Sequence, residues 1–269
     1  MADIVIITYE DEPGAFDSFS VNLLVEAWRN IGHRVTVRRG IDKLPPADLA
    51  FLHVNLSVVP QGYAEAVQPY RRVINGAALD IRKRIVSRNL LDSADEWDGP
   101  VILKSDLNFR GLPESRAERR ARVKGKSVAA GPRPVSKYRI YPHFDAIPAK
   151  LRAVPEMVIE RFLPERIGND YAIRTWLFFG ERERCRRFWG DDPLVKAKSI
   201  KGMEACDVPD FIRSERVRLG FDYGKFDFVM HRNEPILFDA NKTPGKPPAS
   251  PNRDALYAHL AGGLDAFLD

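Results

Sequence analysis

Residues 226–241, FDFVMHRNEPILFDAN, decide the fold of this chain. Two short apolar runs on either side of a polar turn predict a β-hairpin. Side chains alternate along a strand, so Asp227 and Val229 share one face of the first arm, and Asp239 and Asn241 share one face of the second. If the turn is centred on Asn233, Asp227 lies directly opposite Asp239.

Two carboxylates placed in this way predict a cation between them. Facing Cβ atoms in a β-ladder are about 5 Å apart, and like charges at that spacing destabilise the pair. The side chains of Asp227, Asp239 and Asn241 offer hard oxygen ligands, which suit Mg²⁺ with water and phosphate oxygens in its remaining positions. The spacing alone is also compatible with a hairpin that carries two ordinary solvated acids.

The residues after the hairpin favour the first interpretation. Asn241 runs into Lys242-Thr243-Pro244-Gly245, a turn at the end of the strand. The order of acid, hairpin, acid-x-Asn and Pro-Gly resembles the metal-binding end of the ATP-grasp ligases. In that superfamily Glu usually occupies the position of Asp239. The motif order of the chain is similar to that of glutathione synthetase and D-alanine–D-alanine ligase, and the resemblance covers about residues 80–250.

Composition is compatible with this resemblance. The chain has 269 residues, of which 44% are hydrophobic and 29% charged, as in a soluble globular protein. No apolar run approaches the length of about 20 residues that spans a membrane, and we see no signal peptide, so a cytoplasmic location without membrane contact is expected. Lys and Arg exceed Asp and Glu by 42 to 37, which suits an anionic ligand such as a nucleotide.

The fold class expected is α/β. Apolar strands alternate with helical segments over residues 1–79, which predicts an open parallel-sheet domain. The resemblance implies that two α+β lobes of an ATP-grasp fold follow and clamp a nucleotide between them. We expect these lobes to span residues 80–160 and 161–269.

Two lysines are candidate phosphate ligands in the first lobe. Residues 80–92 look like a helix, and Lys83 in it stands where ATP-grasp chains often place a lysine that reaches nucleotide phosphate; a surface lysine is an equal alternative. Lys104 closes the apolar strand 101–104, where its burial requires an anionic partner. By resemblance it would contact the phosphates of ATP. The superfamily follows this strand with a glycine-rich loop, but residues 105–111 contain one glycine, so Asn108 or Arg110 is the expected substitute donor.

Residues 157–165 resemble the hinge between the lobes, where backbone groups bind adenine. The resemblance implies a nucleotide site formed by Glu160, Arg161, Phe162 and Leu163, with Glu165 on the ribose hydroxyls. A simple strand is the alternative. Further on, Arg174 lies in the strong strand predicted over residues 168–180, which ends in a turn, and matches the superfamily's arginine that stabilises the transferring phosphate.

Residues 112–137 form a strongly basic segment with little apolar content. This basic loop could be a mobile lid over a polyanionic ligand, a nucleic-acid patch, or a solvated loop. No aromatic residue interleaves the cluster, which argues against stacking on single-stranded nucleic acid.

The resemblance implies an ATP- and Mg²⁺-dependent ligase that joins a carboxylate to an amine through an acyl phosphate. Lys104 and Arg174 would be the catalytic residues. A nucleotide-binding protein without ligase activity remains an alternative, and a nucleic-acid-binding module is a third, less favoured one. The oligomeric state is open, and a homodimer is one expectation.

Overall fold

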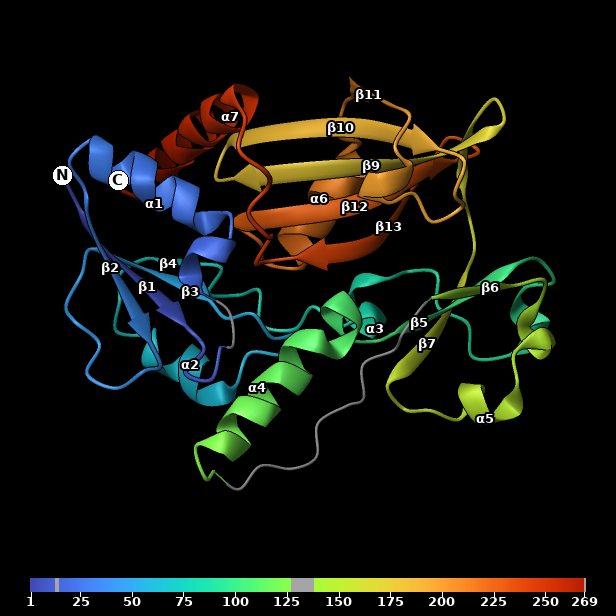
Figure 1. Ribbon diagram of the computed structural model, residues 1–269, viewed down its shortest axis with the longest axis horizontal. Helices are drawn as coiled ribbons and strands as arrows, with labels where there is room; N and C mark the ends of the chain where they lie inside the picture. The colour runs from blue at the N-terminus through green and yellow to red at the C-terminus, as the bar shows by residue number, and fades with distance from the viewer. Residues whose placement is uncertain (13–14, 127–137, 269) are drawn as a thin grey trace.

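The computed structural model describes residues 1–12, 15–126 and 138–268, and this part of the chain forms three β-sheets with helices packed around them (Figure 1). The α/β class that the sequence predicts is confirmed. Each sheet is formed by one contiguous part of the chain. The three sheets follow one another in the order predicted for the N-terminal domain, the first lobe and the second lobe. The exact domain boundaries stay a prediction.

The first sheet is parallel, with strand order β2-β1-β3-β4. Its elements are β1 (Asp3–Thr8), α1 (Val21–Asn30), β2 (Arg34–Arg39), β3 (Leu49–His53), α2 (Gln61–Ala66) and β4 (Val73–Ile74), with a 3₁₀ turn at Phe16–Ser18. The central strand β1 is buried on both faces, as its unbroken apolar sequence predicts.

The second sheet is antiparallel, with strand order β6-β5-β7. Its elements are α3 (Lys83–Val86), β5 (Val101–Ser105), α4 (Leu112–Val123), β6 (Arg139–Tyr141), α5 (Ala149–Arg152) and β7 (Met157–Arg161), with 3₁₀ turns at Ala94–Glu96, Asn108–Gly111 and Phe144–Ala146. One face of β5 packs Val101 and Leu103 into the core of this lobe. The alternate residues Ile102 and Lys104 therefore point away from that core.

The third sheet follows the order β11-β10-β9-β12-β13, and β8 pairs with β9. Its strands are β8 (Glu165–Ile167), β9 (Asp170–Phe179), β10 (Arg182–Gly190), β11 (Gly202–Ala205), β12 (Tyr223–His231) and β13 (Glu234–Asn241). The helical elements of this part are Ala197–Ser199 (3₁₀), α6 (Asp210–Arg218), α7 (Pro251–Ala261) and Gly262–Phe267 (3₁₀).

The hairpin of β12 and β13 has the predicted register, although the turn differs from the expected one. His231 pairs with Glu234, so the turn consists of two residues with positive φ, Arg232 at 51° and Asn233 at 69°. Such a turn alone would place Asp227 opposite Phe238. A β-bulge beside Asp227 shifts the ladder by one residue and brings Asp239 opposite Asp227.

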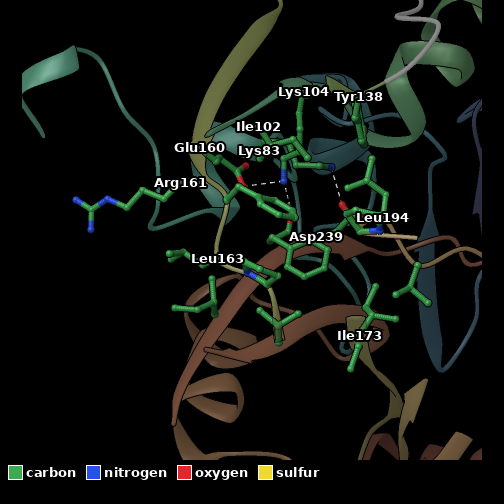
Figure 2. A pocket seen from close by; sticks show the side chains of 18 of the residues that line it. Lys83, Ile102, Lys104, Tyr138, Glu160, Arg161, Leu163, Ile173, Leu194 and Asp239 are labelled. Atoms are coloured by element: carbon green, nitrogen blue, oxygen red, sulfur yellow. Dashed lines mark hydrogen bonds and ion pairs between the residues drawn. The ribbon is translucent and has the colours of Figure 1, made fainter. Parts of the chain in front are cut away.

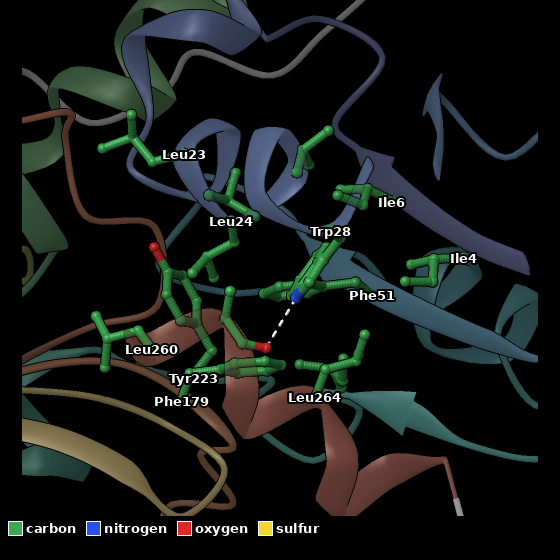
Figure 3. Close-up of a cluster of buried hydrophobic side chains, with 14 of the residues drawn as sticks. Ile4, Ile6, Leu23, Leu24, Trp28, Phe51, Phe179, Tyr223, Leu260 and Leu264 are labelled. Atoms are coloured by element: carbon green, nitrogen blue, oxygen red, sulfur yellow. Dashed lines mark hydrogen bonds between the residues drawn. The ribbon is translucent and has the colours of Figure 1, made fainter. Parts of the chain in front are cut away.

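The N-terminal sheet and the third sheet share one hydrophobic core (Figure 3). Trp28 of α1 is fully buried, and its indole N–H donates to the carbonyl of Ala261 at 2.9 Å. Phe51 of β3 stacks on Phe179 of β9 with ring centroids 6.3 Å apart. Helices α1 and α7 pack side by side (Figure 1), so an N-terminal and a C-terminal segment of the chain are in contact at this core.

The predicted helix over residues 80–92 is wrong in extent, since α3 covers only Lys83–Val86. The residues after it pair with the edge of β7 instead. The amide of Leu91 donates to Ile159 at 2.9 Å, and the amide of Arg161 donates to Asn89 at 2.9 Å. Backbone pairing with a strand distant in the sequence overrides the local helical pattern here.

The predicted basic loop is also wrong over its first half, because residues 112–123 form α4. Its C-terminal end is attached to the N-terminal domain, where the ammonium of Lys124 lies 2.5 Å from Asp11 and that of Lys126 lies 2.6 Å from Glu10. The second half of the predicted loop, residues 127–137, lies outside the described residues. Within the described ranges, no helix is both long enough and apolar enough to cross a membrane.

Candidate active site

A cavity of about 260 Å³ lies between the second and third sheets (Figure 2). Both sheets, the segment that joins them and the loop after β10 line it. The lining residues are Lys83, Ile102, Lys104, Tyr138, Glu160–Pro164, Ala172, Ile173, Pro193–Lys196, Val229, Ile236, Phe238 and Asp239. Lys83, Lys104, Glu160 and Asp239 lie together in one part of the cavity, and Leu163 and Ile173 lie away from them. The cavity is thus charged in one part and apolar in another.

The charged part contains two buried ion pairs from four different elements. The ammonium of Lys83 lies 2.5 Å from Asp239, and the ammonium of Lys104 lies 2.7 Å from Glu160. Lys104 also donates to the carbonyl of Phe238 at 3.3 Å. The anionic partner that the sequence requires for Lys104 is therefore a carboxylate of the protein itself.

The charges in this part stabilise one another. Burial lowers the pKa of Lys83, but the attraction of Asp239 outweighs it, and the pKa lies above its usual value. Burial raises the pKa of Asp239, and Lys83 more than reverses this, so the carboxyl pKa is lowered. Lys83 is cationic and Asp239 is anionic at neutral pH.

The predicted metal ligands lie together at the end of the hairpin. Asp227 accepts from Thr175 at 2.8 Å and from the ammonium of Lys225 at 2.7 Å. The amide oxygen of Asn241 accepts from the backbone of Thr243 at 2.9 Å. The positive charge expected between Asp227 and Asp239 is supplied here by lysines, one on each carboxylate.

This donor set fits a hard divalent cation. Asp227 and Asp239 are directly opposed, and Asn241 follows on the same strand. Each carboxylate carries a lysine counter-ion that a metal could replace, and oxygen donors of this kind suit Mg²⁺. Among the described residues, no group of three or more His, Cys, Asp or Glu side chains is placed to hold a metal ion, so the proposed set is limited to two carboxylates and an amide oxygen. The metal assignment stays a prediction.

Comparison with known structures identifies the fold. No protein-family model and no curated sequence matches the chain. A RimK-domain ATP-grasp protein from Sphaerobacter thermophilus matches it with a TM-score of 0.53 and 14% identity over 100% of both chains. The D-alanine–D-alanine ligase of Bacillus anthracis, solved with ATP, matches with a TM-score of 0.52 and 15% identity over 99% of this chain and 95% of that one.

A Chryseobacterium gregarium RiPP-associated ATP-grasp ligase, solved with ADP and with a leader and a core peptide, matches with a TM-score of 0.53 and 10% identity over 97% of this chain and 96% of that chain. The chain has the ATP-grasp fold. The resemblance inferred from the motif order is confirmed at this level.

Of the predicted hinge, residues 157–165, only the part from Glu160 to Pro164 lines the cavity. The amides of Arg161 and Phe162 are used within the fold, by Asn89 and by Pro100 at 2.8 Å. In the described part of the chain, the amide of Leu163 donates to no protein acceptor. The buried Oε1 of Glu160 likewise has no donor there. The hinge therefore presents one unused donor and one unused acceptor.

Glu165 and Arg174 are not among the residues that line the cavity, and they bind each other. The guanidinium of Arg174 donates to Glu165 at 2.9 Å, Arg187 adds a contact at 3.3 Å, and the amide of Met230 donates at 2.8 Å. Burial raises the pKa of Glu165, but these donors outweigh it and the pKa is lowered. The structure therefore gives both residues partners inside the lobe.

Sequence reasoning missed Lys225 and Tyr138. Lys225 lies in an apolar strand, as Lys104 does, and this pattern could have revealed it; burial lowers its pKa, but Asp227 more than compensates, so the lysine is cationic. Tyr138 lines the cavity, and nothing in its local sequence indicates a site. The loop Pro193–Lys196 also lines the cavity, and the basic run of Lys196, Lys198 and Lys201 is the sequence signal that a loop meeting phosphate would carry.

Proposed function

We propose that the cavity binds ATP, with the adenine at the hinge and the phosphates beside Lys83 and Lys104. Purine edges carry adjacent donors and acceptors, which match the unused amide of Leu163, the backbone carbonyl of Arg161 and the unpartnered oxygen of Glu160. Two buried ammonium groups beside the apolar part suit a ligand with an apolar base and an anionic tail.

Asp227, Asp239 and Asn241 would hold Mg²⁺ at the phosphate end. A bound Mg²⁺ would supply positive charge to the phosphate oxygens. Lys83 and Lys225, which neutralise the two carboxylates in the structure, lie where they could turn to the phosphates once the cation occupies the carboxylates.

The reaction proposed is an ATP-dependent ligation of a carboxylate to an amine. The carboxylate attacks the terminal phosphorus of ATP, so ADP leaves and an acyl phosphate forms; the amine then attacks the acyl carbon and displaces phosphate. Lys104 and Lys83 would stabilise the charge that develops on the transferring group. The observation that carries this proposal is the pair of buried lysines beside two opposed carboxylates.

Arg174 has no part in this proposal, because its guanidinium is bound by Glu165. The substrates proposed are a small-molecule or peptide carboxylate and an amine. The fold neighbours support this range, since one is named as a D-alanine–D-alanine ligase and another was solved with peptides. A cytoplasmic location, where ATP and Mg²⁺ are supplied, belongs to the same proposal.

The first experiment identifies the spent nucleotide. The protein is incubated with MgATP and a panel of carboxylates and amines that includes amino acids and peptides, and the nucleotides are separated by chromatography. We expect ADP and phosphate as the primary products, and no ATP consumption after chelation of the metal. Lys104→Met and Asp239→Asn should each lower turnover by about 10²-fold, as expected for the loss of one charge-stabilising group.

Lys150→Met is the matched control, because Lys150 lies exposed on α5 of the same lobe. It should leave turnover unchanged. AMP as the primary product would exclude the acyl-phosphate mechanism. Tight MgATP binding without turnover of any acid in the panel would favour a nucleotide-binding protein that lacks ligase activity.

A further inference from the structure

Residues 106–126, the described part of the chain directly after β5, lead away from the cavity. Phe109, Arg110 and Gly111 all adopt left-handed backbone conformations, with φ of 45°, 63° and 74°. This turn directs the chain into α4, which leads away from the cavity toward the N-terminal domain. There the carboxylate of Glu114 accepts from the amide of Ser57 at 2.7 Å.

None of the described residues 106–126 lines the cavity. Asn108 and Arg110, the donors expected from the sequence, are not among the residues that line the cavity. The side chain of Asn108 instead donates to Asn241 at 3.4 Å. Of the described residues between β5 and β6, only Tyr138 lines the cavity.

Tyr138 lies in the charged part of the cavity, near Lys83 and Lys104 and away from Leu163 (Figure 2). Within the described ranges its hydroxyl has no hydrogen-bond partner. Burial raises the pKa of Tyr138 to about 12, so the hydroxyl keeps its proton at physiological pH and can donate a hydrogen bond. The charges that act on it most strongly are those of Lys83 and Asp239.

We propose that Tyr138 donates a hydrogen bond to the terminal phosphate of ATP. The proposal rests on the proposed ATP site. The terminal phosphate is the expected partner because Tyr138 lies near Lys83, and Lys83 pairs with Asp239, one of the predicted metal ligands.

Tyr138→Phe tests this assignment, because it removes the hydroxyl and keeps the ring. Binding of the β,γ-imido analogue of ATP and of ADP, each with Mg²⁺, is measured by calorimetry on the full chain. We expect Tyr138→Phe to weaken binding of the triphosphate analogue by about tenfold, the scale of one hydrogen bond to a charged group. Binding of ADP should change by less than about twofold, because ADP lacks the phosphate concerned.

Tyr141→Phe is the matched control. Tyr141 lies on β6, which begins directly after Tyr138, and packs against the core of the lobe; its hydroxyl also has no partner among the described residues. Its removal should leave the affinity for both nucleotides unchanged.

Two results would overturn the assignment while the ATP site stands: unchanged triphosphate affinity in Tyr138→Phe, or an equal loss for ADP and the analogue. A wild-type protein that binds neither nucleotide would remove the proposed function and this inference together. The wild-type titration therefore distinguishes the two failures.

Discussion

Glu165→Gln should destabilise the protein without weakening nucleotide binding. The carboxylate is buried in the third sheet, with its side chain 5% exposed. It accepts from two arginines, Arg174 and Arg187, and from the backbone amide of Met230. A residue that held the ribose would instead face the cavity, so this one substitution separates the structural role from the role that the resemblance implies.

The magnitude follows from the donors that Gln cannot satisfy. One carboxylate oxygen faces Arg174 and Arg187, and the other accepts from Met230 at 2.8 Å and from Arg174 at 3.0 Å. In Gln one of these oxygens becomes an NH₂ group that faces N–H donors, and the negative charge between two arginines is lost. The loss of two charge-assisted hydrogen bonds in a buried cluster costs about 3 kcal/mol. For a chain of this length that lowers Tm by about 5 °C.

The assay is urea unfolding and calorimetric titration with the β,γ-imido analogue of ATP, both on the same preparations. Glu204→Gln is the matched control, because Glu204 also pairs with Arg187 but its side chain is 46% exposed. An exposed pair of this kind contributes less than about 1 kcal/mol. Arg174→Ala should resemble Glu165→Gln, with a loss of stability and a nucleotide affinity close to that of the wild type.

The pH dependence gives an independent check. Because the pKa of Glu165 is lowered in the folded state, its contribution is complete above the unfolded pKa of about 4.3 and is lost as the pH falls through the folded value. The difference between wild type and Glu165→Gln should therefore vanish in acid. A Glu165→Gln protein of unchanged stability that binds nucleotide tenfold more weakly would refute this reasoning and restore the ribose role.

Three further substitutions test a buried amine and two glycine positions. Burial lowers the pKa of Lys242 to about 7, so the unfolded chain binds more protons than the folded chain between that pH and about 10.4. In urea unfolding, the stability of the wild type should therefore rise across this pH range relative to that of Lys242→Met. Parallel stability curves for the two proteins would contradict the burial of a titrating amine. Gly180→Ala should cost more than about 2 kcal/mol by the same measurement, because φ is 52° and a Cβ would lie 2.3 Å from the carbonyl of Gly263. Gly168→Ala, with φ of 56° and nothing within 4 Å, should show only the conformational cost of about 1 kcal/mol, and equal losses at both positions would exclude the clash.

The local sequence was sufficient to predict an element where its pattern of apolar and polar residues fitted only one environment. The unbroken apolar run of β1 predicted a strand buried on both faces, and the two arms around His231–Glu234 predicted the hairpin. Asp227 was correctly placed opposite Asp239, although a β-bulge and a shorter turn produce that register. A lysine at the end of an apolar strand correctly indicated that Lys104 is buried beside an anion.

Only the tertiary structure decided which partners these groups take. Residues 89–91 do not form a helix but pair with β7, because the edge of that strand was free to accept them. Lys124 and Lys126, which follow α4, form ion pairs with Asp11 and Glu10 on a loop distant in the sequence. No local pattern indicates these pairs. Arg174 is bound by Glu165, nine residues earlier in the chain, because β8 folds back onto β9.

The same distinction applies within the site. Charge, size and strand position are local properties, so Lys104, Asp227 and Asp239 could be identified one by one from the sequence. Lys225 pairs with Asp227 of its own strand, whereas Tyr138 joins Lys104 and Asp239 only because separate strands and loops converge on one cavity. The sequence by itself thus determined the strands and the chemical groups they carry, whereas packing between segments far apart in the chain determined which of those groups meet.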